Sequence, residues 1–467
     1  MTHDSQCDTE NFDCGKNEER FEWFDYRLFS GSDGLQGLVE LVRGLCDEAS
    51  GPRQRARKPR DGASFRNSID CLVANLTHVV LTWGWPRPLA VSRKSSTTMD
   101  RNEAVVPFAT FRKCLELMKK VGLVREELGA WNVGPTTIQA TPLLLSMIEC
   151  RTLTFKSFFR SPEHHLVVLK HTITSAKGKK ISVNWVDFET TTETQGATDQ
   201  LAKLNAFLKD ANISFIDDGA RPQVDTEHYR ELVRHFSVRN HQTIRFDQGG
   251  RLYGKTFWLN LPAERRGGLR IDGEPLADLD FQNLGPRIAY VLLGKEPPSG
   301  DLYDLTGLLP GYDHGNPEHR KAIKQSFAAC LNGGAGGNRA PNRKTKKPGI
   351  LAPLPKGTSA AKVRKAIFEK HPGFEVFYER AKAGEVAVGF EIMFKESCIL
   401  LNALERLKDA GVVALPFHDG LMVARSNAQI AKDALRTASK EVLGVELPVV
   451  PKAVAGRSEA VSRALAA

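Results

Sequence analysis

The chain has 467 residues, 41% of them hydrophobic and 26% charged, as expected for a globular protein of about three domains. No apolar run approaches the ~18 residues of a membrane span, and the polar N-terminus predicts no secretory signal. The eight cysteines are scattered without a CxxC pair, which disfavours a disulfide framework or a cysteine zinc site and favours a cytoplasmic location. The net charge of +10 weakly favours a polyanionic partner.

The N-terminal part is predicted to be a tail followed by a small helical domain. Residues 1–60 are polar and end in a basic linker. Residues 61–155 show two amphipathic helices, two short extended runs and a further helix, an order typical of a winged-helix DNA-binding domain. The helix Phe108–Lys120 carries Arg112 and Lys119 on its polar side, where a helix in a major groove would contact DNA. A winged helix can equally bind protein, so both interpretations stay open.

Residues 156–235 are predicted to form a connecting, thumb-like region, and residues 236–467 hold the candidate chemistry. The segment Pro275–Phe281 reads as a strand, in which Asp278 and Asp280 share one face because side chains alternate. The segment 412–424 reads as a hairpin with Asp419 near its turn. Taken singly, each acid fits a solvated strand or a local turn equally well.

A helix with clear ends is predicted between Asn316 and Gly333. Asn316 is a suitable N-cap, proline follows it, and the glycine ends the helix. Arg320 and Lys324 stand four residues apart on one face. They are either solvated or a clamp for phosphates. Two acids from neighbouring strands and fixed cations are what phosphoryl transfer with divalent ions requires.

In these segments the chain resembles the family A nucleic-acid polymerases. Asp280-Phe-Gln-Asn-Leu-Gly-Pro-Arg287 resembles motif A, Arg320 to Gly333 is similar to motif B, and Phe417-His418-Asp419 is similar to motif C. Residues 247–253 resemble the D-x-x-G-R-x-Y element of single-subunit phage-type RNA polymerases. These motifs occur in the family's chain order and cover roughly residues 245–425. The resemblance implies an α+β polymerase palm, an antiparallel sheet with helices, with a small fingers insertion.

The resemblance also implies roles for individual residues. Asp280 and Asp419, with the backbone carbonyl of Phe281, would hold Mg²⁺, or Mn²⁺ in its place. Arg320 and Lys324 would bind the triphosphate, with Lys324 also counted as catalytic, and Asn332 stands where the family carries a tyrosine. Arg251 and His418 would position the growing 3′ end. The other residues expected at the nucleic acid are Asp247, Gly250, Tyr253 and Arg287.

Gly285 bears on the choice of sugar. The DNA polymerases of the family usually carry a glutamate five residues after the motif A aspartate, whereas the phage-type RNA polymerases resemble this chain in having glycine. A glycine leaves room for a ribose 2′-hydroxyl. The other interpretation is that Gly285-Pro286 simply forms a bend after the strand.

The expected function is template-directed nucleotidyl transfer in replication or transcription of a mobile element, with ribonucleotides favoured. The expected partners are a DNA template, nucleoside triphosphates and an RNA product or primer, without a membrane. The alternatives are a DNA polymerase that uses dNTPs, template-independent tailing, and a DNA-binding replication initiator or regulator with an inactive palm. The oligomeric state is open.

Overall fold

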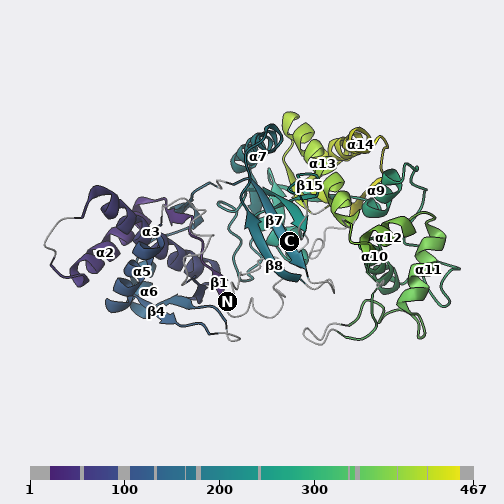
Figure 1. Ribbon diagram of the computed structural model, residues 1–467. Helices are drawn as coiled ribbons and strands as arrows, with labels where there is room; N and C mark the ends of the chain where they lie inside the picture. The colour runs from purple at the N-terminus through teal and green to yellow at the C-terminus, as the bar shows by residue number, and fades with distance from the viewer. Residues whose placement is uncertain are drawn as a thin grey trace. The chain divides into compact units, whose positions relative to one another are not determined.

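The computed structural model describes residues 21–52, 57–92, 106–130, 134–162, 165–174, 180–239, 243–334, 337–341, 348–385, 388–417 and 419–452 (Figure 1). The chain divides into two compact units. The N-terminal unit contains Thr9–His164 and Phe215–Glu231, and the C-terminal unit contains His165–Ser214 and the chain from Leu232 onward. The expected connecting region, residues 156–235, is therefore shared between the units. Each unit combines helices with sheets, so the fold is of the α+β type.

The N-terminal unit packs helices against a small sheet. The sheet has the order β1-β3-β5-β4, and β4 pairs with β5 in an antiparallel hairpin. A second, two-stranded sheet joins β2 to β6. The elements are β1 (Glu22–Trp23), β2 (Leu28–Ser30), α2 (Asp33–Ala49), α3 (Pro59–Trp83), β3 (Leu89–Ala90), α5 (Phe108–Lys120), β4 (Val124–Glu127), β5 (Thr137–Ala140), α6 (Pro142–Glu149), a 3₁₀ turn (Phe155–Ser157) and β6 (Phe158–Arg160).

Local signals and apolar stripes account for these helices. Ser32 and Thr141 cap α2 and α6 by accepting hydrogen bonds from backbone N–H groups three residues later. Gly84 ends α3 with a φ of +80°, a conformation that glycine adopts without strain. The apolar side chains of α2, α3 and α5 are buried together in one core, which stabilises the unit through burial of apolar surface.

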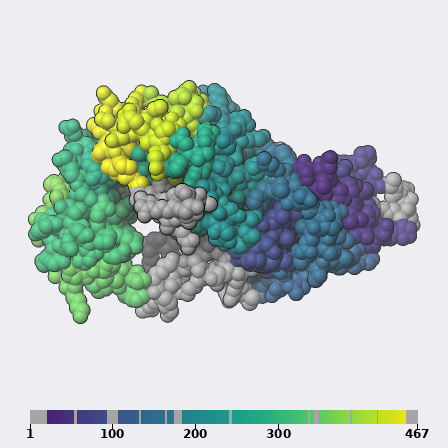
Figure 2. Space-filling view, turned by 180° about the vertical axis from the view of Figure 1, so that it is seen from behind, coloured from purple at the N-terminus to yellow at the C-terminus, as the bar shows by residue number. Residues whose placement is uncertain are grey.

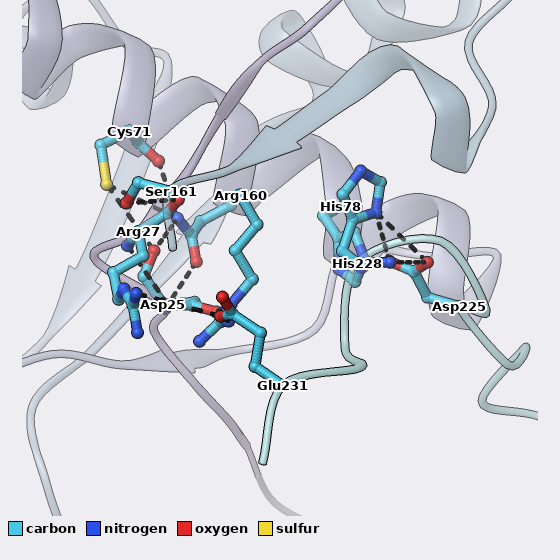
Figure 3. A network of polar contacts seen from close by, with 10 residues as sticks. Asp25, Arg27, Cys71, His78, Arg160, Ser161, Asp225, His228 and Glu231 are labelled. Carbon is cyan, nitrogen blue, oxygen red and sulfur yellow. Dashed lines mark hydrogen bonds and ion pairs between the residues drawn. The ribbon is translucent and has the colours of Figure 1, made fainter. Parts of the chain in front are cut away.

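Buried ionic groups attach the segment 215–231 to the N-terminal unit (Figure 3). Arg160 lies between Asp25 and Glu231, with its Nε 2.8 Å from Asp25 Oδ2 and its Nη1 3.0 Å from Glu231 Oε2. Nearby, Asp225 accepts from two histidines, with its Oδ2 2.8 Å from His78 Nε2 and 3.0 Å from His228 Nδ1. We call Asp225 and these histidines the His–Asp–His cluster.

Both ring nitrogens of His228 face acceptors. Its Nδ1 faces the Asp225 carboxylate, and its Nε2 lies 2.9 Å from the carbonyl oxygen of Phe158. Two hydrogen bonds to acceptors require two N–H donors, so this arrangement selects the imidazolium. Burial alone would lower the pKa of His228, but the hydrogen bond and charge of Asp225 outweigh it and raise the pKa above 6.5. Although burial opposes it, the two histidines hold the pKa of Asp225 far below its ordinary value.

The C-terminal unit contains two larger sheets. One has the order β11-β10-β7-β8, and the other has the order β14-β15-β13-β12-β9 with β16 also paired to β13. The strands are β7 (Val167–Thr174), β8 (Lys180–Val186), β9 (Ile213–Phe215), β10 (Val233–Arg239), β11 (Gly249–Tyr253), β12 (Leu269–Ile271), β13 (Glu274–Phe281), β14 (Ala414–Phe417), β15 (Gly420–Ala424) and β16 (Val449–Lys452). We call the first the β11–β8 sheet and the second the β13 sheet.

Helices accompany both sheets. Those of the C-terminal unit are α7 (Thr192–Asp210), α8 (Phe257–Asn260), α9 (Leu284–Leu292), α10 (Pro317–Leu331), α11 (Ala360–Lys370), α12 (Glu375–Lys382), α13 (Val388–Asp409) and α14 (Ala428–Leu443), with 3₁₀ turns at Ala263–Gly268 and Arg425–Asn427. The described residues between 284 and 385 form a helical insertion between β13 and α13. Figure 2 shows this insertion, in green, and α14, in yellow, at the surface. None of the helices in the described ranges is both long and apolar enough to cross a bilayer.

A buried histidine organises the helical insertion. His371 is fully buried beside Phe327 and Phe374. Its Nδ1 lies 2.9 Å from the Tyr290 hydroxyl, which donates, and its Nε2 lies 2.8 Å from the carbonyl oxygen of Leu302, which accepts. Burial lowers the pKa of His371 to about 4, so the ring is neutral near pH 7. The predicted helix after Asn316 is confirmed as α10, and Asn316 caps it through Glu318 N at 3.0 Å.

Candidate active site

The central strand β13 brings two aspartates of distant sequence positions together. It pairs with β15 in antiparallel register, with Asp280 opposite Gly420, the residue directly after Asp419. A Cβ on Gly420 would lie 2.3 Å from the carbonyl oxygen of Leu279, so only glycine permits this approach of the strands. Asp419, at the turn between β14 and β15, is half-buried and acts electrostatically on Asp280.

Asp280 has one carboxylate oxygen without a partner. The residue is 6% exposed. Its Oδ2 is ion-paired with Lys452, whereas its Oδ1 has no hydrogen-bond partner in the described part of the chain. Burial and the negative charge of Asp419 raise the pKa of Asp280 above its ordinary value, against the opposing effects of Lys452 and Lys324. A buried, unsatisfied carboxylate oxygen is costly, and a bound cation would relieve that cost.

Further charged groups surround this pair on the β13 sheet. Asp278 lies on the same strand, and burial raises its pKa, as does the charge of Asp419, while Lys452 and Arg266 oppose the shift. Lys452 reaches the site from β16, where it stands opposite Asp278. Neither Lys452 nor Arg266 was identified from the sequence, because the pairing of β16 with β13 has no local signal.

The helix α13 adds a further acid, Glu396, which was not identified from the sequence either. Glu396 is 8% exposed and accepts a hydrogen bond from Arg251 Nε at 3.2 Å. Burial raises the pKa of Glu396, Arg251 opposes this, and the charges of Asp419 and Asp280 add to the rise. The signal was present: Glu396 lies four residues after Ile392 and four before Leu400, within the apolar stripe of α13. A carboxylate in such a stripe indicates a buried ion pair.

The position of Arg251 depends on two glycines and a buried arginine. Gly249 and Gly250 have φ values of +74° and +76°, and a Cβ on Gly250 would lie 2.9 Å from Ser397 Oγ. Arg234 donates to the carbonyl oxygen of Gly250 at 3.1 Å and to Ser397 Oγ at 3.2 Å. These contacts hold β11 against α13, so that Arg251 meets Glu396.

The two cations of α10 have different surroundings. Arg320 Nε donates to Asp301 Oδ2 at 2.7 Å, and Asp301 also accepts from Asn283 Nδ2 at 2.9 Å. Asn283 belongs to the motif A segment, so this chain of contacts ties α10 to the end of β13. Lys324 is exposed, and its charge acts on Asp280.

The backbone at position 285 does not require a glycine. It is the second residue of α9, and its φ is not in the left-handed region. A Cβ at this position would find only Ile392 Cγ2 within 4 Å, at 3.9 Å. The backbone at position 285 therefore accepts a residue other than glycine without strain.

The remaining predicted residues are placed as follows. Arg287 is 5% exposed and donates to the carbonyl oxygens of Gln282, Pro298 and Gly300, so its guanidinium stabilises a turn. Asn332 ends α10 and donates to the Ala328 carbonyl oxygen at 2.8 Å. Phe281 is buried and follows Asp280 in β13, and Asp247 is ion-paired with Arg245. Tyr253 is half-buried on β11, and Arg112 and Lys119 lie on α5 of the N-terminal unit. His418 lies outside the described residues.

The residues of this site suit a magnesium ion that is shared with substrate phosphates, and not a metal ion held by protein ligands alone. Among the described residues, no three His, Cys, Asp or Glu side chains are grouped to hold a metal ion. Mg²⁺ in phosphoryl-transfer sites is typically held by one or two carboxylates and by substrate phosphates. Asp280 and Asp419 provide such a pair, and the unpaired Oδ1 of Asp280 is a free ligand atom within the described site.

No protein-family model and no curated protein matches the chain. Among solved structures, the chain is similar to the POL domain of Pol1 from M. smegmatis, which was solved in complex with DNA primer-template and dNTP. The TM-score is 0.30 and the sequence identity is 14%, over 91% of this chain and 66% of the other. A TM-score of this size does not establish a shared fold, so function has to be inferred from the site itself.

Proposed function

We propose that the C-terminal unit is a nucleotidyltransferase that extends a nucleic-acid strand by metal-assisted phosphoryl transfer. The observation that carries the proposal is the Asp280–Asp419 pair, in which Asp280 lies on β13 and Asp419 lies at the turn into the adjacent strand β15. One buried carboxylate oxygen of Asp280 has no partner among the described residues. Burial and the like charge of Asp419 raise the pKa of Asp280, so a divalent cation is the ligand that this site favours. Lys324 on α10 supplies a cation close enough to act on the same carboxylate.

Each residue has a defined part in this proposal. Asp280 and Asp419 would hold the ions, with the Phe281 carbonyl as a further ligand. Bound Mg²⁺ would lower the pKa of the attacking 3′-hydroxyl and offset charge on the transferred phosphate. Lys324 binds the triphosphate and stabilises charge that develops on it. Arg320, oriented by Asp301, contributes a second cation, and Arg251, oriented by Glu396, positions the strand end.

Incubation of the purified full chain with a primed DNA template, Mg²⁺ and labelled nucleotides tests the proposal. We expect template-dependent extension with rNTPs that stops when EDTA removes the metal. Extension with dNTPs alone would identify a DNA polymerase, and products of equal length without template would identify a tailing enzyme. No incorporation with either nucleotide, with Mg²⁺ or Mn²⁺, would contradict the proposal and favour an initiator with an inactive palm.

The choice of ribonucleotides depends on Gly285. Because a Cβ fits there, Gly285→Ala is expected to raise the free energy of unfolding by about 0.5 kcal/mol. Gly285→Glu is expected to lower the preference for rNTPs over dNTPs by about tenfold or more, since its side chain would fill the space of a 2′-hydroxyl. Urea unfolding and competition between rNTPs and dNTPs provide the measurements.

Gly196 offers the matched control for Gly285. It lies in α7, has no positive φ, and a Cβ there would meet no heavy atom within 4 Å. Gly196→Ala should therefore give a similar gain in stability without a change in sugar preference. Unaltered sugar preference in Gly285→Glu would show that Gly285 does not sense the sugar.

We further propose that the N-terminal unit binds duplex DNA as a winged-helix-like module through α5. Arg112 is exposed on this helix, whereas Lys119 is ion-paired with Glu116 at 3.0 Å and Glu126 at 2.7 Å. An ion-paired lysine has less charge to offer a phosphate. Arg112→Ala should therefore reduce the slope of log K against log salt by about 1, more than Lys119→Ala does.

These slopes are measured by fluorescence anisotropy of labelled duplex DNA, with the salt concentration varied between about 50 and 300 mM. Arg112→Lys keeps the charge and should keep the slope. An Arg112→Ala protein with the wild-type slope would remove Arg112 from the proposed interface.

A further inference from the structure

The β11–β8 sheet has two chemically different faces. Val167, Leu169, Phe236 and Val238 are buried on one face, packed with Phe394 of α13. Side chains alternate along a strand, so the residues between them point to the other face. On that face lie Lys170 of β7, Trp185 of β8, His235 of β10 and Tyr253 of β11, all half-buried. This face thus carries rings and a cation beside the aliphatic side chains of Val168 and Val183.

These four residues form a continuous row across the sheet. The ring centroids of Trp185 and His235 are 5.4 Å apart, and those of His235 and Tyr253 are 4.6 Å apart. Lys170 stands directly opposite Trp185 in the strand register, and its Nζ lies 4.7 Å from the Trp185 ring and 5.7 Å from the Tyr253 ring. We call this row the aromatic platform.

We propose that the aromatic platform binds a single strand of nucleic acid and leads its end to the active site. Every base has a π-face that stacks on an aromatic ring, and a cation among the rings attracts the phosphates. An apolar peptide would not use the ammonium group of Lys170, and a cationic partner would be repelled by it. A single strand offers bases that can stack on the rings and phosphates that the cation attracts.

The strand register connects the platform to the proposed catalytic residues. Tyr253 lies two residues after Arg251 on the same strand, and His235 stands directly opposite Arg251. Arg251 in turn binds Glu396, and the charges of Asp419 and Asp280 act on Glu396. A strand stacked on the platform would therefore pass Arg251 before reaching Asp280. This part of the inference rests on the proposed nucleotidyl transfer, whereas the binding of a single strand does not.

Binding can be measured apart from catalysis. Labelled 12-mers of oligothymidine and oligouridine are titrated with the full chain in EDTA without nucleotides, and anisotropy gives Kd. We expect Trp185→Ala and Tyr253→Ala each to weaken binding about tenfold, in line with the energy of one stacked base. Trp185→Phe should retain most of the affinity, because it keeps a ring. Tighter binding of either oligonucleotide would show whether the platform prefers DNA or RNA.

Photo-crosslinking locates the contact and guards against misfolded variants. Oligonucleotides with 5-iodouridine are irradiated with the wild-type chain, and mass spectrometry identifies the crosslinked peptides. Crosslinks to Trp185 or Tyr253 support the platform even if an alanine variant fails to fold. Wild-type affinity in both folded alanine variants, or crosslinks confined to residues outside the β11–β8 sheet, would overturn the inference.

Asp280→Asn separates this inference from the proposed function. Its carboxylate does not belong to the platform, so it should bind both 12-mers as the wild type does, even where incorporation is lost. Binding by the platform without incorporation by the wild type would contradict the nucleotidyltransferase proposal and leave the platform standing. Incorporation by the wild type, with no effect of the Trp185 and Tyr253 variants on oligonucleotide binding, would support the nucleotidyltransferase proposal and overturn the platform.

Discussion

Asp280→Asn is expected to lower nucleotide incorporation by at least about 10³-fold, since a bound ion supplies several kcal/mol of transition-state stabilisation and each 1.4 kcal/mol is tenfold in rate. Asp419→Asn should have a similar effect, because the two carboxylates act on one site. Single-turnover extension of a primed template under saturating Mg²⁺ measures both losses. The amide keeps the size of the side chain and removes its charge.

Stability should move in the opposite direction from activity. Asp280 is buried, and both burial and Asp419 disfavour its charged form, so neutral asparagine removes an unfavourable group. Thermal unfolding of Asp280→Asn is therefore expected at the wild-type temperature or above it. Asp433, an exposed acid on α14, provides the matched control, and Asp433→Asn should keep full activity. Full activity in Asp280→Asn would refute the assigned role.

Asp225→Asn is expected to destabilise the N-terminal unit by about 3 kcal/mol, because it leaves a buried imidazolium without its counter-ion. The side chain of Asp225 is only 4% exposed and contacts both His78 and His228. The loss should be visible as faster hydrogen exchange in the segment 215–231 and in α3. Asp217 lies in the same segment but is exposed, so Asp217→Asn should leave exchange unchanged.

The His–Asp–His cluster also predicts a pH dependence with a definite sign. The folded pKa of His228 is raised from 6.5, so its contribution is complete below pH 6.5 and is lost as pH rises through the folded value. The folded pKa of Asp225 is lowered from 3.8, so its contribution is present above pH 3.8 and is lost as pH falls through the folded value. The protection factors for exchange in the segment 215–231, which correct for the pH dependence of exchange itself, should therefore be largest between these two pH values. A flat profile there would contradict the imidazolium.

Local structure was largely predictable from the sequence, because its signals are local. Asn316 with the following proline marked the start of α10. Alternation and a turn signal located β13 and the hairpin β14–β15. The pairing of these strands was inferred only through the resemblance to a polymerase palm, since strand order carries no local signal.

The missed residues depend on contacts between distant segments. Lys452 reaches Asp280 only because β16 pairs with β13. The register places Val450 opposite Asp280, 170 positions earlier, and Lys452 opposite Asp278, 174 positions earlier. Arg287 was expected at the nucleic acid, yet its carbonyl partners turn it inward, and we leave it out of the proposed interface. Glu396 was missed because its partner, Arg251, stands 145 positions earlier, on β11.

The path of the chain has a practical consequence for dissecting the molecule. The chain enters the C-terminal unit at His165, returns through Phe215–Glu231, and enters again at Leu232. A fragment that starts at His165 would carry Asp225 and His228 away from His78 and Phe158, exposing charged groups that normally have partners. A single proteolytic cut near residue 164 would likewise leave both halves joined by noncovalent contacts. Independent preparations of the two parts therefore call for excision of residues 215–231 with a short bridging sequence, not for simple truncation.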